Sequence, residues 1–229
     1  MEDPIRAQLF ALAEPGYKTF TEKLTPDAPP VLGVRMPALR KLAKTISKGD
    51  FRAWLENPDI LYHEEVILQG LVIGCAPMDA DERFSRIAAF VPGITNWAAC
   101  DTFCSSLAFI PQNRGRMWKF LQPYFRSQKE FEVRFAVVTA LCFYADPDFA
   151  GKALETFNAI RQDGYYVKMG IAWAVSVYYI KVPWLTEPFL VNNDLDDFTH
   201  NKSLQKITES FRVSAEKKAW IRSLKRGKK

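Results

Sequence analysis

The sequence of 229 residues is poor in metal-binding side chains, since it holds only two histidines and four cysteines. His63 and His200 lie far apart, and no third or fourth ligand at metal spacing accompanies Cys100 and Cys104. This scarcity argues against a zinc site. We therefore expect no metal and no cofactor, and we expect Cys100 and Cys104 to be buried thiols.

Three larger patterns are also missing from the sequence. No apolar run has the length of a membrane span, no secretory signal is recognisable, and no alternating apolar–polar pattern with hairpin turns predicts a sheet. The four cysteines, Cys75 and Cys142 among them, lie inside apolar stretches. This placement favours a reducing, intracellular setting, so we expect a cytoplasmic protein that makes no membrane contact.

Excess positive charge is scarce outside the C-terminal segment. Residues 201–229 carry ten Lys or Arg and two Glu, a net charge of +8, whereas the remaining residues carry 21 basic and 24 acidic side chains, a net charge of −3. Such a concentration is typical of a surface that contacts phosphate groups. The alternative for Lys225–Lys229 is a solvated, lysine-rich tail.

Almost every segment has helical length and periodicity. The expected helices are Pro4–Ala13, Pro37–Ser47, Tyr62–Cys75, Asp79–Phe90, Trp97–Phe109, Asn113–Leu121, Phe131–Tyr144, Pro147–Ile160, Tyr165–Lys181 and Ser203–Phe211. Two stretches, Val133–Tyr144 and Ile171–Val182, have the composition of strands. We predict helices there as well, because each stretch is long and falls in the helical half of a repeat.

Consecutive helices pair into units of about 35–40 residues, which is the length of a HEAT-like repeat. The predicted fold is therefore all-α, a right-handed α-solenoid with a concave basic groove, formed by a single domain over residues 1–229. Residues 1–32 would form a short N-terminal helical region and a proline-rich connector. Residues 213–229 would form a basic C-terminal helix or tail.

Four side chains recur at the spacing of this repeat. Trp97 and Asp101 lie four residues apart and would share one helix face. Arg134 follows Trp97 by 37 residues, and Trp173 follows Arg134 by 39. Equivalent positions on every second helix would line one surface, so we expect a site for a cationic or sugar-phosphate ligand.

Five segments, taken together, give the chain a family resemblance. Residues 33–44 (Gly-Val-Arg-Met-Pro-Ala-Leu-Arg-Lys-Leu-Ala-Lys) resemble the first repeat of the DNA alkylation repair family, the HEAT-like-repeat DNA glycosylases. Residues 96–101 (Asn-Trp-Ala-Ala-Cys-Asp) resemble its central Asn-Trp-x-x-x-Asp motif. The repeat that bears the family's arginine is similar to residues 131–134, and the repeat that bears its second tryptophan is similar to residues 165–173. Its C-terminal repeat is similar to residues 199–207.

The resemblance implies a helical solenoid that grips duplex DNA and hydrolyses the N-glycosidic bond of N3- or N7-alkylated purines in base excision repair. Asp101 would lie beside the deoxyribose between Trp97 and Trp173, and Arg134 would bind the phosphate near the lesion. We expect further DNA contacts from the basic side chains Arg35, Lys168, Lys202, Lys206 and Arg212. The protein would act as a monomer associated with the nucleoid.

The residue types suit this chemistry. A purine alkylated at N3 or N7 carries a positive charge and leaves readily, so the oxocarbenium-like sugar is what requires stabilisation. The carboxylate of Asp101 suits that role, and the indole faces of Trp97 and Trp173 attract positive charge with about 0.5–2 kcal/mol each. Arg134 can hold a phosphate with two parallel hydrogen bonds.

Several alternatives remain open on the sequence. Arg134 could instead pair with Asp101 in a structural ion pair between helices. Glu64 and Glu65, like Asp79, Asp81 and Glu82, fit helix-start or solvated charges without a catalytic role. Residues 13–32 leave room for one short helix around Tyr17–Leu24, so the chain resembles a subgroup with a shortened N-terminal region.

That shortening keeps two other classes of function under consideration. One is a non-catalytic protein that binds distorted or branched DNA. The other is a protein–protein scaffold of HEAT repeats, which explains neither Asp101 nor the +8 segment.

Overall fold

A computed structural model describes residues 4–56 and 59–227 of the chain. Within these residues it contains fourteen α-helices, two short 3-10 helices and no strand. The all-α prediction is confirmed. The two stretches with the composition of strands are helical, since they lie in α9 and α11.

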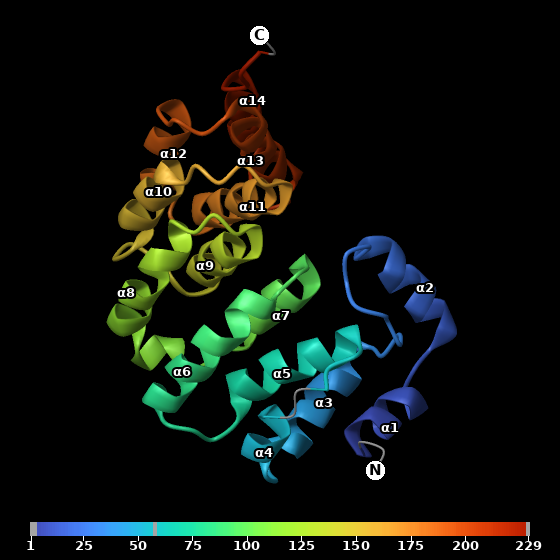
Figure 1. Ribbon diagram of the computed structural model, residues 1–229. Helices are drawn as coiled ribbons and strands as arrows, with labels where there is room; N and C mark the ends of the chain where they lie inside the picture. Colours follow the sequence, from blue (N-terminus) through green and yellow to red (C-terminus); the bar gives the residue numbers. More distant parts are fainter. Residues whose placement is uncertain (1–3, 57–58, 228–229) are drawn as a thin grey trace. The chain divides into compact units, whose positions relative to one another are not determined.

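The bounds of the helices are α1 Pro4–Ala11, α2 Pro15–Leu24, α3 Met36–Ile46, α4 Phe51–Leu55, α5 His63–Cys75, α6 Ala80–Phe90, α7 Trp97–Ser106, α8 Arg114–Phe125, α9 Glu130–Phe143, α10 Ala150–Ala159, α11 Tyr165–Lys181, α12 Pro183–Val191, α13 Asp197–Glu209 and α14 Ala215–Ser223 (Figure 1). Each of the ten expected helices is present. The short helix expected around Tyr17–Leu24 is α2.

The largest error in a helix boundary concerns α13, which begins at Asp197 and not at the predicted Ser203. Asp196 caps it, because its carboxylate accepts hydrogen bonds from the backbone N–H groups of Phe198 and Thr199. Phe198 is the one large apolar residue of the first turn, so this turn offers no apolar periodicity. The short helix α4 and the proline-containing α12 lay outside the ten expected helices for a similar reason, since neither is long enough to display a period.

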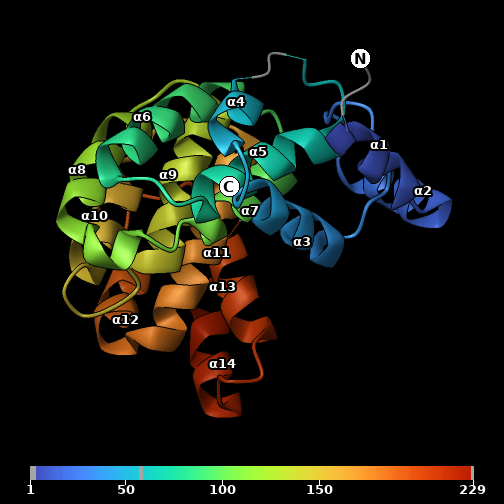
Figure 2. The same ribbon diagram turned by 90° about the horizontal axis from the view of Figure 1, so that it is seen from below.

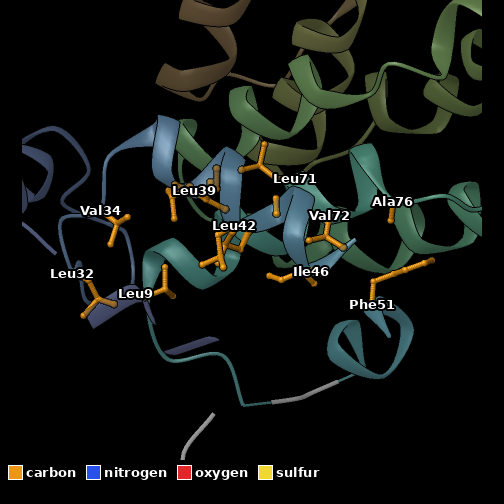
Figure 3. Close-up of a cluster of buried hydrophobic side chains, with 14 residues drawn as sticks. Leu9, Leu32, Val34, Leu39, Leu42, Ile46, Phe51, Leu71, Val72 and Ala76 are labelled. Carbon is orange, nitrogen blue, oxygen red and sulfur yellow. The ribbon is translucent and has the colours of Figure 1, made fainter. Parts of the chain in front are cut away.

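The helices divide between two compact units, residues 1–112 and 113–229. In the first unit α5 packs between α3 and α7, and α6 lies against α5. Figure 3 shows the core of this unit, where Leu9 of α1 joins Leu39 and Leu42 of α3 and Leu71 and Val72 of α5.

In the second unit α11 packs between α9 and α13, while α8, α12 and α14 pack against α9, α11 and α13 respectively (Figure 2). Aromatic rings fill the core, and Phe157 meets Tyr178 edge to face at 5.6 Å. The buried hydroxyl of Tyr178 donates to the carbonyl of Ala140 at 3.1 Å, and burial raises the pKa of Tyr178 well above its usual range. The solenoid and the single domain stay predictions.

The cysteines follow the expectation in part. Cys100 and Cys104 are buried thiols on α7, as predicted. Cys75, at the end of α5, is exposed although its neighbours are apolar, and its sulfur lies 3.1 Å from the hydroxyl of Ser47. The described residues include no group of three or more side chains that could hold a metal ion.

The end of the described chain is anchored and is not a solvated tail. The backbone N–H of Arg226 donates to the side-chain oxygen of Asn201 at 2.9 Å, and the Asn201 amide donates back to the Arg226 carbonyl at 3.0 Å. The guanidinium of Arg226 also donates to the carbonyl of Asn193 at 2.7 Å. These bonds hold Arg226 against α13 and the loop before it. Lys228 and Lys229 lie outside the described residues.

Glu64 and Glu65 lie in the first turn of α5, so of the two expected settings the helix start is confirmed, and the solvated face is excluded because both are 2% exposed. Glu65 does act at a helix start, because it accepts from the backbone N–H groups of Leu61 and Tyr62 at 2.8 and 3.0 Å. Glu64 instead holds the loop before α3. Its carboxylate accepts from three consecutive backbone N–H groups at 2.7–3.1 Å, those of Leu32, Gly33 and Val34.

We expect Glu64→Gln to lower the free energy of unfolding by about 1–3 kcal/mol, because an amide cannot accept from all three backbone donors and leaves a buried N–H without a partner. Urea unfolding measures the change. The matched control is Glu22→Gln on α2, where an exposed pair with Lys18 at 3.9 Å should contribute less than about 0.5 kcal/mol. Equal losses in both variants would contradict this role of Glu64.

Candidate active site and nucleic-acid interface

Trp97 and Asp101 owe their positions to the start of α7. The side chain of Asn96 caps the helix by accepting from the N–H of Ala99 at 3.0 Å, so Trp97 is the first helical residue. Asp101 follows one turn later on the same face. The Asn-Trp-x-x-x-Asp spacing is therefore a cap followed by two side chains that share a face, as predicted.

Trp97 connects α7 to α2. Its indole Nε1–H donates to the carbonyl of Leu24, the last residue of α2, at 3.0 Å. Behind this bond is a cavity of about 180 Å³ between α2, α3, α5 and α7, lined in part by Trp97 and Asp101. Both side chains remain partly exposed. The predicted carboxylate and the first predicted tryptophan therefore share one small cavity.

The remaining walls of this cavity are mostly apolar and aromatic. Tyr17 and Phe20 of α2 line one side, and Met36 and Leu39 of α3 line another. Tyr17 and Phe20 are not among the site residues predicted from the sequence. Their three-residue spacing on a predicted helix was the available signal, but which face α2 turns inward depends on tertiary contacts.

Two polar residues of α5, His63 and Glu64, also line the cavity. Both oxygens of Glu64 are occupied by the loop at Leu32–Val34. His63 is 2% exposed, and its Nδ1 has no hydrogen-bond partner among the described residues. Burial lowers the pKa of His63 against a smaller, opposing effect of Glu64. The imidazole is therefore kept neutral.

Arg35 is exposed beside the same cavity, in the first unit. Its guanidinium pairs with Glu14 at 2.9 Å and lies 4.8 Å from the centre of the Tyr17 ring. Both partners belong to the segment that begins α2. Arg35 is therefore held close to the cavity as a surface cation, where a backbone phosphate could replace Glu14.

Arg134 lies on α9 in the second unit and is only 6% exposed. Its Nη1 donates to the backbone carbonyl of Tyr166 at 2.6 Å, and its guanidinium carbon lies 6.0 Å from the centre of the Tyr166 ring. Gly170 on α11 lies against it, since a Cβ there would be in ordinary van der Waals contact with Nη1 at 3.5 Å. Trp173, two turns after Tyr166 on α11, is partly exposed.

Three of the predicted DNA contacts lie near the same end of the second unit. Arg134 reaches the start of α11, Lys168 on the first turn of α11 reaches the start of α13, and Lys202 follows on α13. Lys168 pairs with Asp163 and lies 3.7 Å from Asp196. The hydrogen bond to Asp163 is the main cause that raises the pKa of Lys168.

The other two predicted cations differ in position. Lys206 lies one turn beyond Lys202 on α13 and makes no ion pair with any described residue. Arg212 is exposed beyond the C-terminal end of α13, where it lines a surface depression with Tyr179 and Trp184. The structure therefore does not group Arg212 with Arg134 and Lys168, which lie at the N-terminal ends of their helices.

The described residues form an all-helical protein with a carboxylate beside an indole in the first unit and with cations and aromatic rings at adjacent helix starts in the second. Residues 5–209 match the family model described as DNA alkylation repair enzyme, and the chain belongs to this family. Its role therefore lies in alkylation repair, and its partner is DNA. None of the curated proteins compared with the chain matches it.

The matched region begins within α1 and includes α2, so the N-terminal helices lie inside the family region. Among the residues that the structure describes, no helix has both the length and the apolar character needed to cross a bilayer.

The buried histidine predicts how stability depends on pH. Burial lowers the pKa of His63 in the folded protein below its ordinary value of 6.5. As the pH falls through 6.5, the unfolded chain therefore binds a proton at this imidazole more readily than the folded chain does. Stability should be complete above that pH and should fall as the pH drops towards the folded pKa, by at most about 1.4 kcal/mol per pH unit for each such group.

Burial lowers the pKa of His200 in the same direction. We therefore expect His63→Gln and His200→Gln each to remove part of the slope in urea unfolding measured between about pH 7.5 and 5. An unchanged slope in His63→Gln would contradict the lowered pKa, because it would mean that this imidazole binds a proton equally well in the folded and the unfolded protein.

Proposed function

We propose that the protein is a DNA glycosylase that hydrolyses the N-glycosidic bond of cationic, N3- or N7-alkylated purines. The observation that carries the proposal is the cavity on α7, where Asp101 and Trp97 lie together beneath α2. Membership of the alkylation repair family supports the same role.

The reaction breaks the bond between the sugar C1′ and the purine nitrogen and forms a bond from C1′ to a water oxygen. The departing purine takes both electrons of the broken bond, which neutralises its positive charge, so no strong acid is required. Asp101 would stabilise the oxocarbenium-like sugar and orient the attacking water, whose proton passes to the carboxylate or to solvent. Trp97 and Trp173 would face the same positive charge with their indole rings.

The surroundings of Asp101 favour this role. The cavity walls are mostly apolar and aromatic, and a carboxylate acts more strongly on a nearby cation where the local dielectric is low. The hydrogen bond from Trp97 to Leu24 holds the indole in one orientation before the substrate arrives. Such preorganisation avoids reorganisation in the transition state.

The second unit would supply the phosphate contacts. Arg134, Lys168 and Lys202 lie in the N-terminal halves of α9, α11 and α13, and Lys206 follows Lys202 one turn later on α13. In the proposed complex the two units form one right-handed, HEAT-like solenoid whose concave basic groove brings these cations and Trp173 to the same DNA as Asp101. The protein would bind alkylated duplex DNA as a cytoplasmic, nucleoid-associated monomer.

Asp101→Asn is expected to abolish the release of 7-methylguanine and 3-methyladenine from methylated duplex DNA, with a rate loss of at least about 100-fold. The amide keeps the shape of the side chain but removes the negative charge. Chromatography of the released bases under single-turnover conditions measures the effect. Glu22→Gln, which neutralises an exposed carboxylate on α2, should release bases at the wild-type rate.

Absence of base release by the wild-type protein in large excess over DNA would reject the enzymatic proposal. Full activity of Asp101→Asn would instead reject Asp101 as the essential carboxylate.

Arg134→Ala is expected to weaken DNA binding and to reduce the slope of log affinity against log salt concentration by about one phosphate contact. Because Arg134 is buried, the free energy of unfolding should fall as well. Fluorescence anisotropy at several salt concentrations gives the slope. An unchanged slope, with equal losses of stability in Arg134→Ala and Asp101→Asn, would favour a structural ion pair.

A second candidate function is non-catalytic binding of distorted or branched DNA. The observation that favours it is the set of exposed cations on α14 and on the segments that flank it, since Arg212, Arg222 and Lys225 are exposed and make no ion pair with any described residue. Binding in the absence of base release would support this function.

A further inference from the structure

Two aromatic side chains stand exposed at neighbouring helix starts in the second unit. Tyr165, the first residue of α11, is 58% exposed, and Phe198, on the first turn of α13, is 42% exposed. Their ring centres lie 6.2 Å apart. These rings are not covered by the protein core, so their flat faces are available to a ligand.

The rings continue inward as a row. Tyr165 meets Tyr166 at 5.4 Å, and Tyr166 meets Phe131 of α9 at 5.3 Å. The row therefore runs across the starts of α9, α11 and α13, and its two most exposed rings are those of Tyr165 on α11 and Phe198 on α13. Arg134 lies beside Tyr166, and Lys202 lies 5.9 Å from the centre of the Phe198 ring.

Phe198 is also part of an open trough of about 780 Å³ between α13 and α14. The cationic side chains Lys202, Arg222 and Lys225 line the trough together with Leu204. Asn201, Gln205 and Thr208 add hydrogen-bonding groups. The combination of cations, an aromatic face and amide groups differs from an ordinary solvated surface.

The charge of the trough is positive. Asp197 is its one acidic residue, and it faces the guanidinium of Arg226 at 3.9 Å. Arg222 and Lys225 are exposed, with no ion pair to any described residue. A polyanion that enters the trough could therefore bind Arg222 and Lys225 without breaking an existing ion pair.

One wall of the trough is fixed by the anchored end of the chain. The paired hydrogen bonds between Asn201 and Arg226 hold that end against α13. His200 shares a further hydrogen bond with the carbonyl of Leu224 at 3.0 Å. Lys225, between these two anchors, is thereby held at the trough and is not on a free tail.

We propose that this trough, together with the exposed rings of Tyr165 and Phe198, binds a single unpaired DNA strand. Bases in a duplex are stacked on each other and cannot present a face to an aromatic side chain, whereas unpaired bases can. Phe198 and Tyr165 would stack on bases, and Arg222 and Lys225 would hold the phosphates. The inference rests on the proposed function only in taking DNA as the partner, since it makes no use of Asp101.

The test compares a blunt duplex with the same duplex carrying a single-stranded thymidine tail of about eight nucleotides, using fluorescence anisotropy. Stacking on one aromatic residue contributes about 1–3 kcal/mol per base, so we expect the tail to tighten binding at least about tenfold. Phe198→Ala and the double variant Arg222→Ala/Lys225→Ala should each lose most of this gain. Phe198→Trp should retain it, because an indole face also stacks.

The matched control is Lys218→Ala, which removes one positive charge from α14 without changing the lining of the trough. It should leave the ratio of tailed to blunt affinity unchanged. Thermal unfolding of each variant checks that the exposed positions 198, 222 and 225 can be changed without loss of the fold.

Two results would overturn the inference: equal affinity of the wild-type protein for tailed and blunt duplexes, or equal losses on both DNAs in Phe198→Ala. The release of alkylated bases from blunt duplex distinguishes this failure from that of the proposed function. A tail preference without base release would reject the proposed glycosylase activity and support strand binding in the trough. Base release without a tail preference would support the glycosylase activity and reject strand binding in the trough.

Discussion

The first unit depends on one buried carboxylate, that of Glu64. By accepting from three consecutive backbone N–H groups, it fixes the turn at Leu32–Val34 that connects α2 to α3. Gly33 in that turn has a φ of 94°, and a Cβ there would lie 2.6 Å from both the Glu14 carbonyl and the Lys18 nitrogen. Only glycine fits, because α2 starts directly against it. The Gly33 carbonyl in turn accepts from the Glu14 N–H at 3.0 Å.

The candidate active site follows from this constraint. With its start tied to Gly33, α2 extends to Leu24, whose carbonyl receives the indole N–H of Trp97. The cavity that contains Asp101 is therefore closed by a helix whose two ends are held by separate polar contacts. A change in the turn would move the cavity wall before it moved Asp101. The N-terminal region, which the sequence suggested was short, is thus part of the site.

The sequence predicts the helices well wherever an apolar period extends over several turns, as in α5 and α11. It misplaces the start of α13, because a cap made by Asp196 and a first turn with one large apolar residue show no period. The Trp97–Asp101 pair could be predicted, since four-residue spacing suffices for one face. The burial of Glu64 could not be predicted, because it depends on three donors that lie 30–32 residues away in the sequence. The same holds for the trough, which depends on Arg226 and Asn201 meeting across 25 residues.

The central claim is that the charge of Asp101 faces a positive sugar. The most direct measurement is the affinity for a duplex with a cationic pyrrolidine in place of the deoxyribose, relative to the same duplex with a neutral tetrahydrofuran. The wild-type protein should prefer the cationic duplex about tenfold, or about 1.4 kcal/mol, and Asp101→Asn should lose that preference. The same ratio in both proteins would contradict the account, because it would mean that the carboxylate does not meet the sugar.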